Sequence, residues 1–241
     1  MADLPYFGKS AKTIQKLLLI KETLSEYYNK VKGEKANIFH ILDLHSVETS
    51  INNRCPICEE SDCAQFFTYY PRHVVEENGK TYTDFPIARF LCKKTKRTFS
   101  LLPYQLIPYR KYSIDFIFLA LTKKYLEEES NTEVLNKLSG LDENDFLKID
   151  TSQLADFREL AEESVSKLLA TNYYLEFKDI ISEANANKHL MRFIEFAKDF
   201  ESTKTEVQIR GPCALSFDFY LAGGSSLQGA QFLFGTPSQF R

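Results

Sequence analysis

Four of the five cysteines in this chain of 241 residues fall between positions 55 and 92, and their spacing constrains the fold more than any other feature. Cys55 and Cys58 form a C-x-x-C pair, Cys63 follows five residues later, and Cys92 stands alone further on. A C-x-x-C turn directs two sulfurs toward one point, and a second turn across a hairpin supplies the other ligands of a tetrahedral metal ion. The spacing therefore predicts a small antiparallel β unit held by a metal.

The residues between these cysteines favour such a hairpin. Residues 66–70 are four aromatic residues and one threonine, types that strands favour, and Asn78-Gly79 is a strong turn signal because both residues tolerate positive φ. Residues 81–90 then read as the returning strand, interrupted by Pro86. The expected layout is a cysteine turn, a hairpin and a second cysteine turn.

The second turn departs from the pattern, because Thr95 stands where a fourth cysteine is expected. A threonine hydroxyl is a poor ligand for zinc. Cys63 is the favoured replacement, His73 is the alternative, and a decayed site without metal is the third possibility. We expect Zn²⁺ bound by Cys55, Cys58, Cys63 and Cys92. Cys213 is left out as a buried thiol.

Other chemistry of clustered thiols is less compatible with the sequence. A redox C-x-x-C belongs in a βαβ pattern, which is absent here, and hairpin spacing favours zinc over an iron–sulfur cluster.

No apolar run reaches the roughly 18 residues of a membrane span, and the N-terminus lacks a signal-peptide pattern. The expected compartment is therefore cytoplasmic, where clustered cysteines are metal ligands more often than disulfides.

A basic segment overlaps the second half of the cysteine region. Seven Lys and Arg residues and no acid fall between positions 89 and 111, although the net charge of the chain is -3. Such side chains neutralise phosphates, and interleaved tyrosines can stack on bases. The alternative is a solvated basic face that balances the acidic helices within the molecule. The predicted nucleic-acid contacts are Lys93, Lys94, Lys96, Arg97, Arg110 and Lys111.

Apolar periodicity predicts helices on both sides of the β unit, over residues 10–31, 114–125, 152–170, 173–184 and 188–200. Ser113 is a candidate N-cap for the helix over 114–125. Residues 38–44 fit a strand or a helical turn equally well. The expected fold is α+β, mostly helical with a small zinc-ribbon-like antiparallel β unit. The expected divisions are a helical segment 1–50, the zinc-ribbon-like domain 51–112, a helical region 113–210 and an irregular tail 211–241, packed through Phe217, Phe219, Phe232 and Phe234.

About 60 residues resemble the zinc-ribbon domain of bacterial insertion-sequence transposases and related uncharacterised proteins. The likeness rests on CPIC, FTYYPRHV and the run from Arg97-Thr98-Phe99-Ser100 through Leu102-Pro103 and Pro108-Tyr109 to Tyr112-Ser113. This resemblance implies DNA-related work on a mobile element, with a helix-turn-helix among the helices that follow. Thr95 departs from the family pattern, and no set of strand-borne carboxylates supports transposase catalysis.

We therefore expect a non-catalytic DNA-binding or accessory protein, with DNA as its partner and a separate transposase as a second one. No nucleophile motif, P-loop or metalloprotease motif is present, and His40 and His45 are not spaced as a helical ligand pair. The alternative from another class is a protein-interaction module with a degenerate ribbon, which would bind its partner through its acidic helices.

Overall fold

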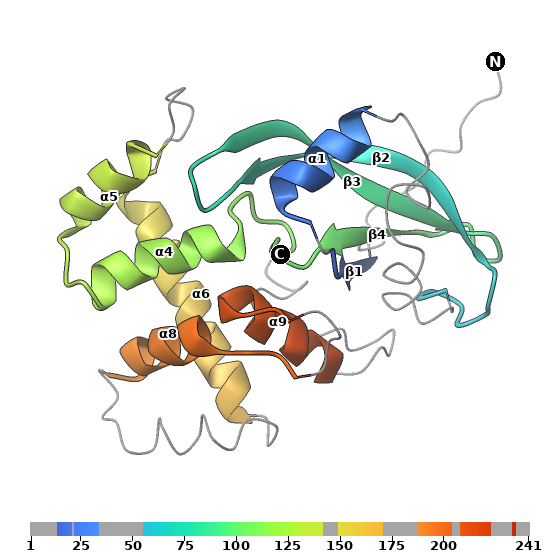
Figure 1. Cartoon of the computed structure of the whole chain (residues 1–241). Helices are drawn as coiled ribbons and strands as arrows, with labels where there is room; N and C mark the ends of the chain where they lie inside the picture. Colours follow the sequence, from blue (N-terminus) through green and yellow to red (C-terminus); the bar gives the residue numbers. More distant parts are fainter. Residues whose placement is uncertain are drawn as a thin grey trace.

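The computed structural model describes residues 14–20, 22–33, 55–141, 149–170, 188–203, 208–222 and 233–234. Its strands form one sheet in the order β1-β4-β3-β2 (Figure 1). The strands are β1 (Ile14–Leu18), β2 (Ala64–Val75), β3 (Thr81–Cys92) and β4 (Thr98–Pro103). β3 pairs antiparallel with both β2 and β4, whereas β1 joins β4 in parallel. The sheet is therefore mixed, with the predicted antiparallel unit as its larger part.

The hairpin of β2 and β3 forms where the turn signal predicts it. The Gly79 backbone has a φ of +81°, and its N–H donates to the Glu76 carbonyl at 3.0 Å. β3 continues through Pro86 because Pro71 stands opposite, so the two residues without an amide N–H share one pair of the ladder. β3 is central in the sheet, and its side chains at Phe85, Ile87, Ala88 and Phe90 are fully buried.

The predicted N-terminal helix is wrong in its first half. Residues 14–18 are a strand, with Leu17 paired to Leu102 of β4. Consecutive residues from Gln15 to Leu18 are all buried, which is typical of a strand covered on both faces. Apolar residues at positions 17 and 18 are compatible with one face of a helix and also with a buried strand, so apolar periodicity alone does not distinguish the two structures. The segment expected to be helical thus completes the β unit.

Helix α1 (Leu24–Gly33) is the remaining part of that prediction, and it packs across the sheet (Figure 1). Thr23 and Glu26 form a capping box at its start, with the Thr23 N–H donating to the Glu26 carboxylate at 2.9 Å. The Tyr27 ring stacks on Phe85 of β3 at 5.5 Å between centroids. Aromatic packing therefore fixes α1 to the central strand.

A second core lies among the helices that follow the sheet. These are α4 (Ile114–Tyr125), α5 (Asn131–Ser139), α6 (Thr151–Ala170), α8 (His189–Asp199) and α9 (Gly211–Ala222). The N-cap predicted at Ser113 is confirmed, because its hydroxyl accepts from the Phe116 N–H at 3.2 Å. Helix α5 was not predicted, although its capping box of Ser130 and Glu133 is a readable start signal.

The C-terminal tail was expected to be irregular from residue 211, and that expectation is wrong over α9. This helix is apolar on every side, so it shows no amphipathic period from which a helix could be predicted. Phe217 faces the core beside the sheet, whereas Phe219 belongs to the helical core. Phe234 is buried there too, as expected. α9 therefore joins the two cores.

The predicted α+β class is confirmed, as are the helices expected near residues 114–125, 152–170 and 188–200. The predictions for residues 38–44, for the helix over 173–184, and for His40, His45 and Phe232 lie outside the described residues. Among the described helices, none combines the length and apolarity that crossing a bilayer requires.

Replacing Gly79 tests the hairpin turn. A Cβ at this position would lie 2.5 Å from the Cβ of Leu141, on a backbone whose φ is positive. We expect Gly79→Ala to lower the free energy of unfolding by about 1–3 kcal/mol, measured by urea denaturation. Gly140→Ala is the control, because Gly140 has an ordinary helical φ of -71°. Equal stability of the two variants would contradict this account of the turn.

Candidate metal centre

The four clustered cysteines converge at one end of the sheet. The sulfur atoms of Cys55, Cys58, Cys63 and Cys92 all lie within 4.8 Å of one another, and those of Cys63 and Cys92 are 3.4 Å apart. None of these cysteines is in a disulfide. Three of the four side chains are buried, and that of Cys58 is partly exposed. The predicted ligand set is therefore brought together by the fold.

Two backbone turns of the same design carry the cluster. In the first, the Cys55 N–H donates to the Glu60 carbonyl at 2.9 Å, and the Glu59 N–H donates to the Cys55 carbonyl at 2.8 Å. In the second, the Cys92 N–H donates to the Arg97 carbonyl at 2.8 Å, and the Lys96 N–H donates to the Cys92 carbonyl at 2.9 Å. The donors and acceptors are separated by the same numbers of residues as in the first turn. The fifth residue of each turn, Glu59 or Lys96, has a positive φ. We call these turns, residues 55–60 and 92–97, the two knuckles.

Thr95 occupies in the second knuckle the position that Cys58 occupies in the first. Its N–H donates to the Cys92 sulfur at 3.3 Å. The second knuckle therefore keeps the backbone of a two-cysteine turn although it holds one cysteine. Cys63 supplies the missing sulfur from the start of β2, where its carbonyl accepts the Lys93 N–H at 3.1 Å. Cys63, the favoured fourth metal ligand, thus lies next to the second knuckle.

The thiols differ in acidity. Burial opposes ionisation of Cys92, but hydrogen bonds from Thr95 and from neighbouring thiols outweigh it and lower the pKa of Cys92 to about 6. A hydrogen bond from the Glu60 backbone lowers the pKa of Cys58, yet burial and the other three thiols raise it to about 12. Burial likewise raises the pKa of Cys55. Metal binding must therefore displace protons, and it weakens as pH falls.

The arrangement fits a tetrahedral metal ion. A zinc–sulfur bond of about 2.3 Å implies sulfurs about 3.8 Å apart, between the 3.4 Å and 4.8 Å observed here. The thiols need to shift by about 1 Å at most to reach that geometry. His73 is not part of the cluster: it lies on β2, ten residues beyond Cys63. Among the described residues, the four cysteines can thus bind a metal ion without it.

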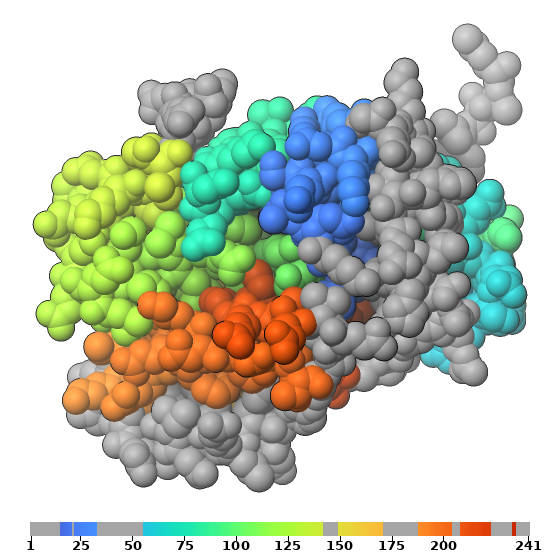
Figure 2. Space-filling model, in the orientation of Figure 1, coloured from blue at the N-terminus to red at the C-terminus, as the bar shows by residue number. Residues whose placement is uncertain are grey.

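The predicted phosphate contacts separate into two groups. Lys93, Lys94, Lys96 and Arg97 are exposed on the second knuckle. Arg110 and Lys111 lie at the opposite end of the hairpin, where the Lys111 carbonyl accepts the Val75 N–H. β2 separates the two ends by about 35 Å. Figure 2 shows the knuckle end on the side of the molecule away from α4 and α5.

Arg110 and Lys111 have contacts inside the molecule. Arg110 lies 3.9 Å from Asp156 of α6, and the Lys111 ammonium lies 4.7 Å from the centre of the Tyr112 ring. The carbonyls of Ile107 and Arg110 both accept from the buried guanidinium of Arg72. Arg72 therefore holds the loop before α4 in place, and Arg110 contacts an acidic side chain of α6, as the intramolecular alternative expects.

Cys213 lies apart from the cluster, as expected. Its thiol donates to the Asp115 carboxylate at 3.1 Å, and burial raises the pKa of Asp115 to about 6.

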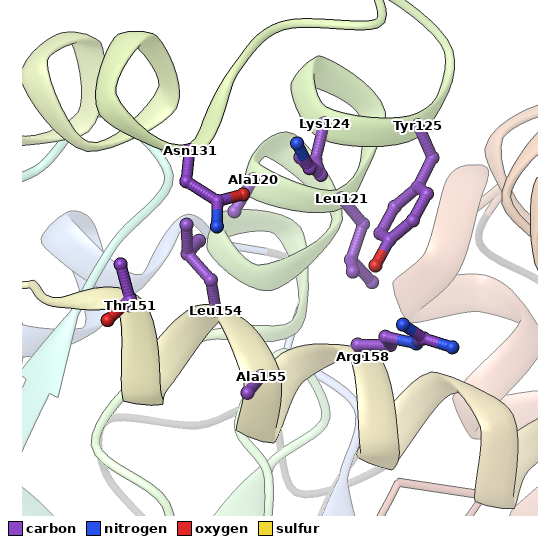
Figure 3. Close-up of a pocket in the computed structure, with 9 residues that line it drawn as sticks. All are labelled: Ala120, Leu121, Lys124, Tyr125, Asn131, Thr151, Leu154, Ala155 and Arg158. Atoms are coloured by element: carbon purple, nitrogen blue, oxygen red, sulfur yellow. The ribbon is translucent and has the colours of Figure 1, made fainter.

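A pocket of about 280 Å³ lies between α4, α5 and α6 (Figure 3). Its described lining includes Lys124, Tyr125 and Arg158 but no carboxylate, histidine or cysteine. The ionisable side chains of this pocket are therefore Lys124, Tyr125 and Arg158.

The fold and the cluster define a class: an α+β protein with a four-cysteine site capable of binding a metal ion. A family model described as a domain of unknown function (DUF6431) matches residues 55–138, about a third of the chain. The match begins at the first cysteine of the cluster and ends in α5. No curated protein and no solved structure matches. The matched stretch thus contains all four clustered cysteines and both knuckles.

Removing one sulfur tests the metal centre. We expect Cys58→Ser to bind less than one metal ion per chain and to lose at least about 3 kcal/mol of unfolding free energy. Elemental analysis and thermal melting measure the two effects. Cys213→Ser is the matched control, because it removes a buried thiol outside the cluster. Full metal content in Cys58→Ser would contradict the ligand set.

The position of Thr95 allows a rescue experiment. Cys63→Ser should lose the metal as Cys58→Ser does, and adding Thr95→Cys should restore one metal ion per chain. The reason is that Thr95 stands in a knuckle whose backbone matches that of the Cys55–Cys58 turn. Metal content and thermal melting of the single and double variants provide the measurement. A double variant without metal would show that the second knuckle cannot present two sulfurs.

Proposed function

We propose that the four thiols hold a structural zinc ion and that the second knuckle contacts nucleic acid, in a non-catalytic protein that acts beside a DNA-processing partner. Four converging sulfurs without an open position suit structural zinc, because catalytic sites keep one position for water. The resemblance to insertion-sequence zinc ribbons supports DNA as the partner. The carrying observation is that Lys96 and Arg97 are exposed on a knuckle of the metal centre.

The four knuckle cations are not equivalent. Lys94 pairs with Glu60 of the first knuckle, and the Lys93 ammonium lies 3.4 Å from the Asp62 carbonyl. The side chains of Lys96 and Arg97 make no hydrogen bond or ion pair with the described residues. Phosphate binding thus falls first to Lys96 and Arg97, whereas Lys94 links the two knuckles and Lys93 contacts the loop after the first.

The size of this basic surface limits its affinity. Two phosphate contacts on duplex DNA give a salt slope of about -1.8, far below that of proteins with six or more contacts. Glu59, Glu60 and Asp62 of the adjacent loop reduce the local positive charge further. A weak and salt-sensitive contact suits an accessory role, in which a second protein or a second site adds to the binding.

Charge removal tests this proposal. We expect Lys96→Ser with Arg97→Ser to reduce the slope of log affinity against log salt by about 2 on duplex DNA of any sequence. Fluorescence anisotropy across a salt series measures it. Arg110→Ser with Lys111→Ser is the matched control and should change the slope little, because Arg110 pairs with Asp156.

Each failure of this experiment has a separate meaning. Equal slopes for the two double variants would rule out the second knuckle as the phosphate contact. Absence of DNA binding by the unaltered, metal-loaded protein at low salt would contradict the function itself. The acidic protein-interaction alternative would then be the better account.

A further inference from the structure

Phe67 is the most exposed of the large hydrophobic side chains in the described part of the chain, with 57% of its surface accessible. It lies on β2, at the outer edge of the sheet. Its neighbour Phe66 instead packs on Phe90, at 5.8 Å between ring centres. Burying a phenylalanine contributes about 2 kcal/mol, which the folded chain alone does not gain at Phe67.

An irregularity in the sheet produces this exposure. Phe66 pairs with Phe90 and Thr68 pairs with Arg89, so Phe67 is an extra residue between two successive pairs. A bulge of this kind redirects a side chain without changing the pairing on either side, and bulges are frequent beside functional sites. The sheet therefore presents Phe67 outward while β2 and β3 stay in register.

Cations lie along the sheet on the way from this position to the second knuckle. Ala64 of β2 pairs with Cys92, so Phe67 lies three residues, about 10 Å, along the strand from the second knuckle. Arg89, opposite Thr68, holds its guanidinium 4.6 Å from the centre of the Tyr70 ring. Arg89 has no carboxylate partner among the described residues, and its Nε is buried without an acceptor. The exposed ring of Phe67 thus lies next to the residue that pairs with Arg89, on the strand whose start pairs with the first residue of the second knuckle.

We propose that Phe67 stacks on an unpaired base of single-stranded DNA whose phosphates contact Lys96 and Arg97. This inference rests on the proposed nucleic-acid function and names its substrate class. An unpaired base exposes its π face, whereas bases in a duplex are already stacked on each other. Stacking complements the two cations because it adds affinity that depends little on salt. The edge position of β2 leaves room for a strand to approach.

The chain contains no tryptophan, so Phe67→Trp gives one fluorophore at the proposed contact. We expect an oligo(dT) of about 15 nucleotides to quench this fluorescence, and Phe67→Trp to keep the affinity of the unaltered protein. Phe67→Ala should weaken oligo(dT) binding roughly tenfold while leaving the salt slope unchanged. Metal content and thermal melting of each variant verify that the knuckles remain intact.

Tyr109→Ala is the matched control, because Tyr109 is an exposed aromatic at the opposite end of the hairpin. Unchanged affinity in Phe67→Ala together with unquenched Phe67→Trp would overturn this inference and leave phosphate binding by the knuckle intact. A loss confined to duplex DNA would also overturn it, because the ring would then act as a wedge between paired bases. If the unaltered protein binds neither DNA form at low salt, the proposed function and this inference fail together.

Discussion

The pairing of β3 with β2 on one side and β4 on the other is the interaction on which the rest of the structure depends. It buries β3 on both faces, and α1 adds its tyrosines to the same strand through Phe85. β3 begins just after the hairpin turn at Gly79, which lies against Leu141 beyond α5. It ends at Cys92 of the cysteine cluster. β3 thus places the helical core and the metal centre at opposite ends of one rigid element.

The two ends are stabilised differently. Near the helices, Tyr112 stacks on Phe116 and meets Phe157 edge-on, so the loop before α4 is held by a core of aromatic rings. At the other end the knuckles are short turns with positive-φ residues at Glu59 and Lys96, which cost backbone strain. A tetrahedral metal ion that links both knuckles to the start of β2 would offset that strain, because metal binding to a folded site adds directly to folding free energy.

Local signals in the sequence predicted the hairpin, the cap at Ser113 and the cysteine cluster, because each is determined within a few residues of the chain. They failed for β1 and α9, where long-range packing decides. Leu17 and Leu18 become a strand only by pairing with β4, and α9 is apolar all round because it joins two cores. The sequence favoured Cys63 as the fourth sulfur, but only the backbone of the second knuckle shows how Cys63 complements Thr95. The basic segment looked continuous in sequence, but β2 and β3 separate its halves.

Charge links the metal centre to the surface above it. A divalent metal ion with four thiolates would carry a net charge of -2, and Glu59, Glu60 and Asp62 would add to it, so cations on the second knuckle would offset this charge before any partner is considered. Lys94 has this role most directly, because the hydrogen bond to Glu60 and the charge of that carboxylate raise the pKa of its ammonium. Lys96 and Arg97 lie at the end of the same knuckle, and their side chains have no hydrogen-bond or ion-pair partner in the described part of the chain. The same knuckle can therefore offset the charge of a bound metal ion with one pair of cations and leave the other pair exposed.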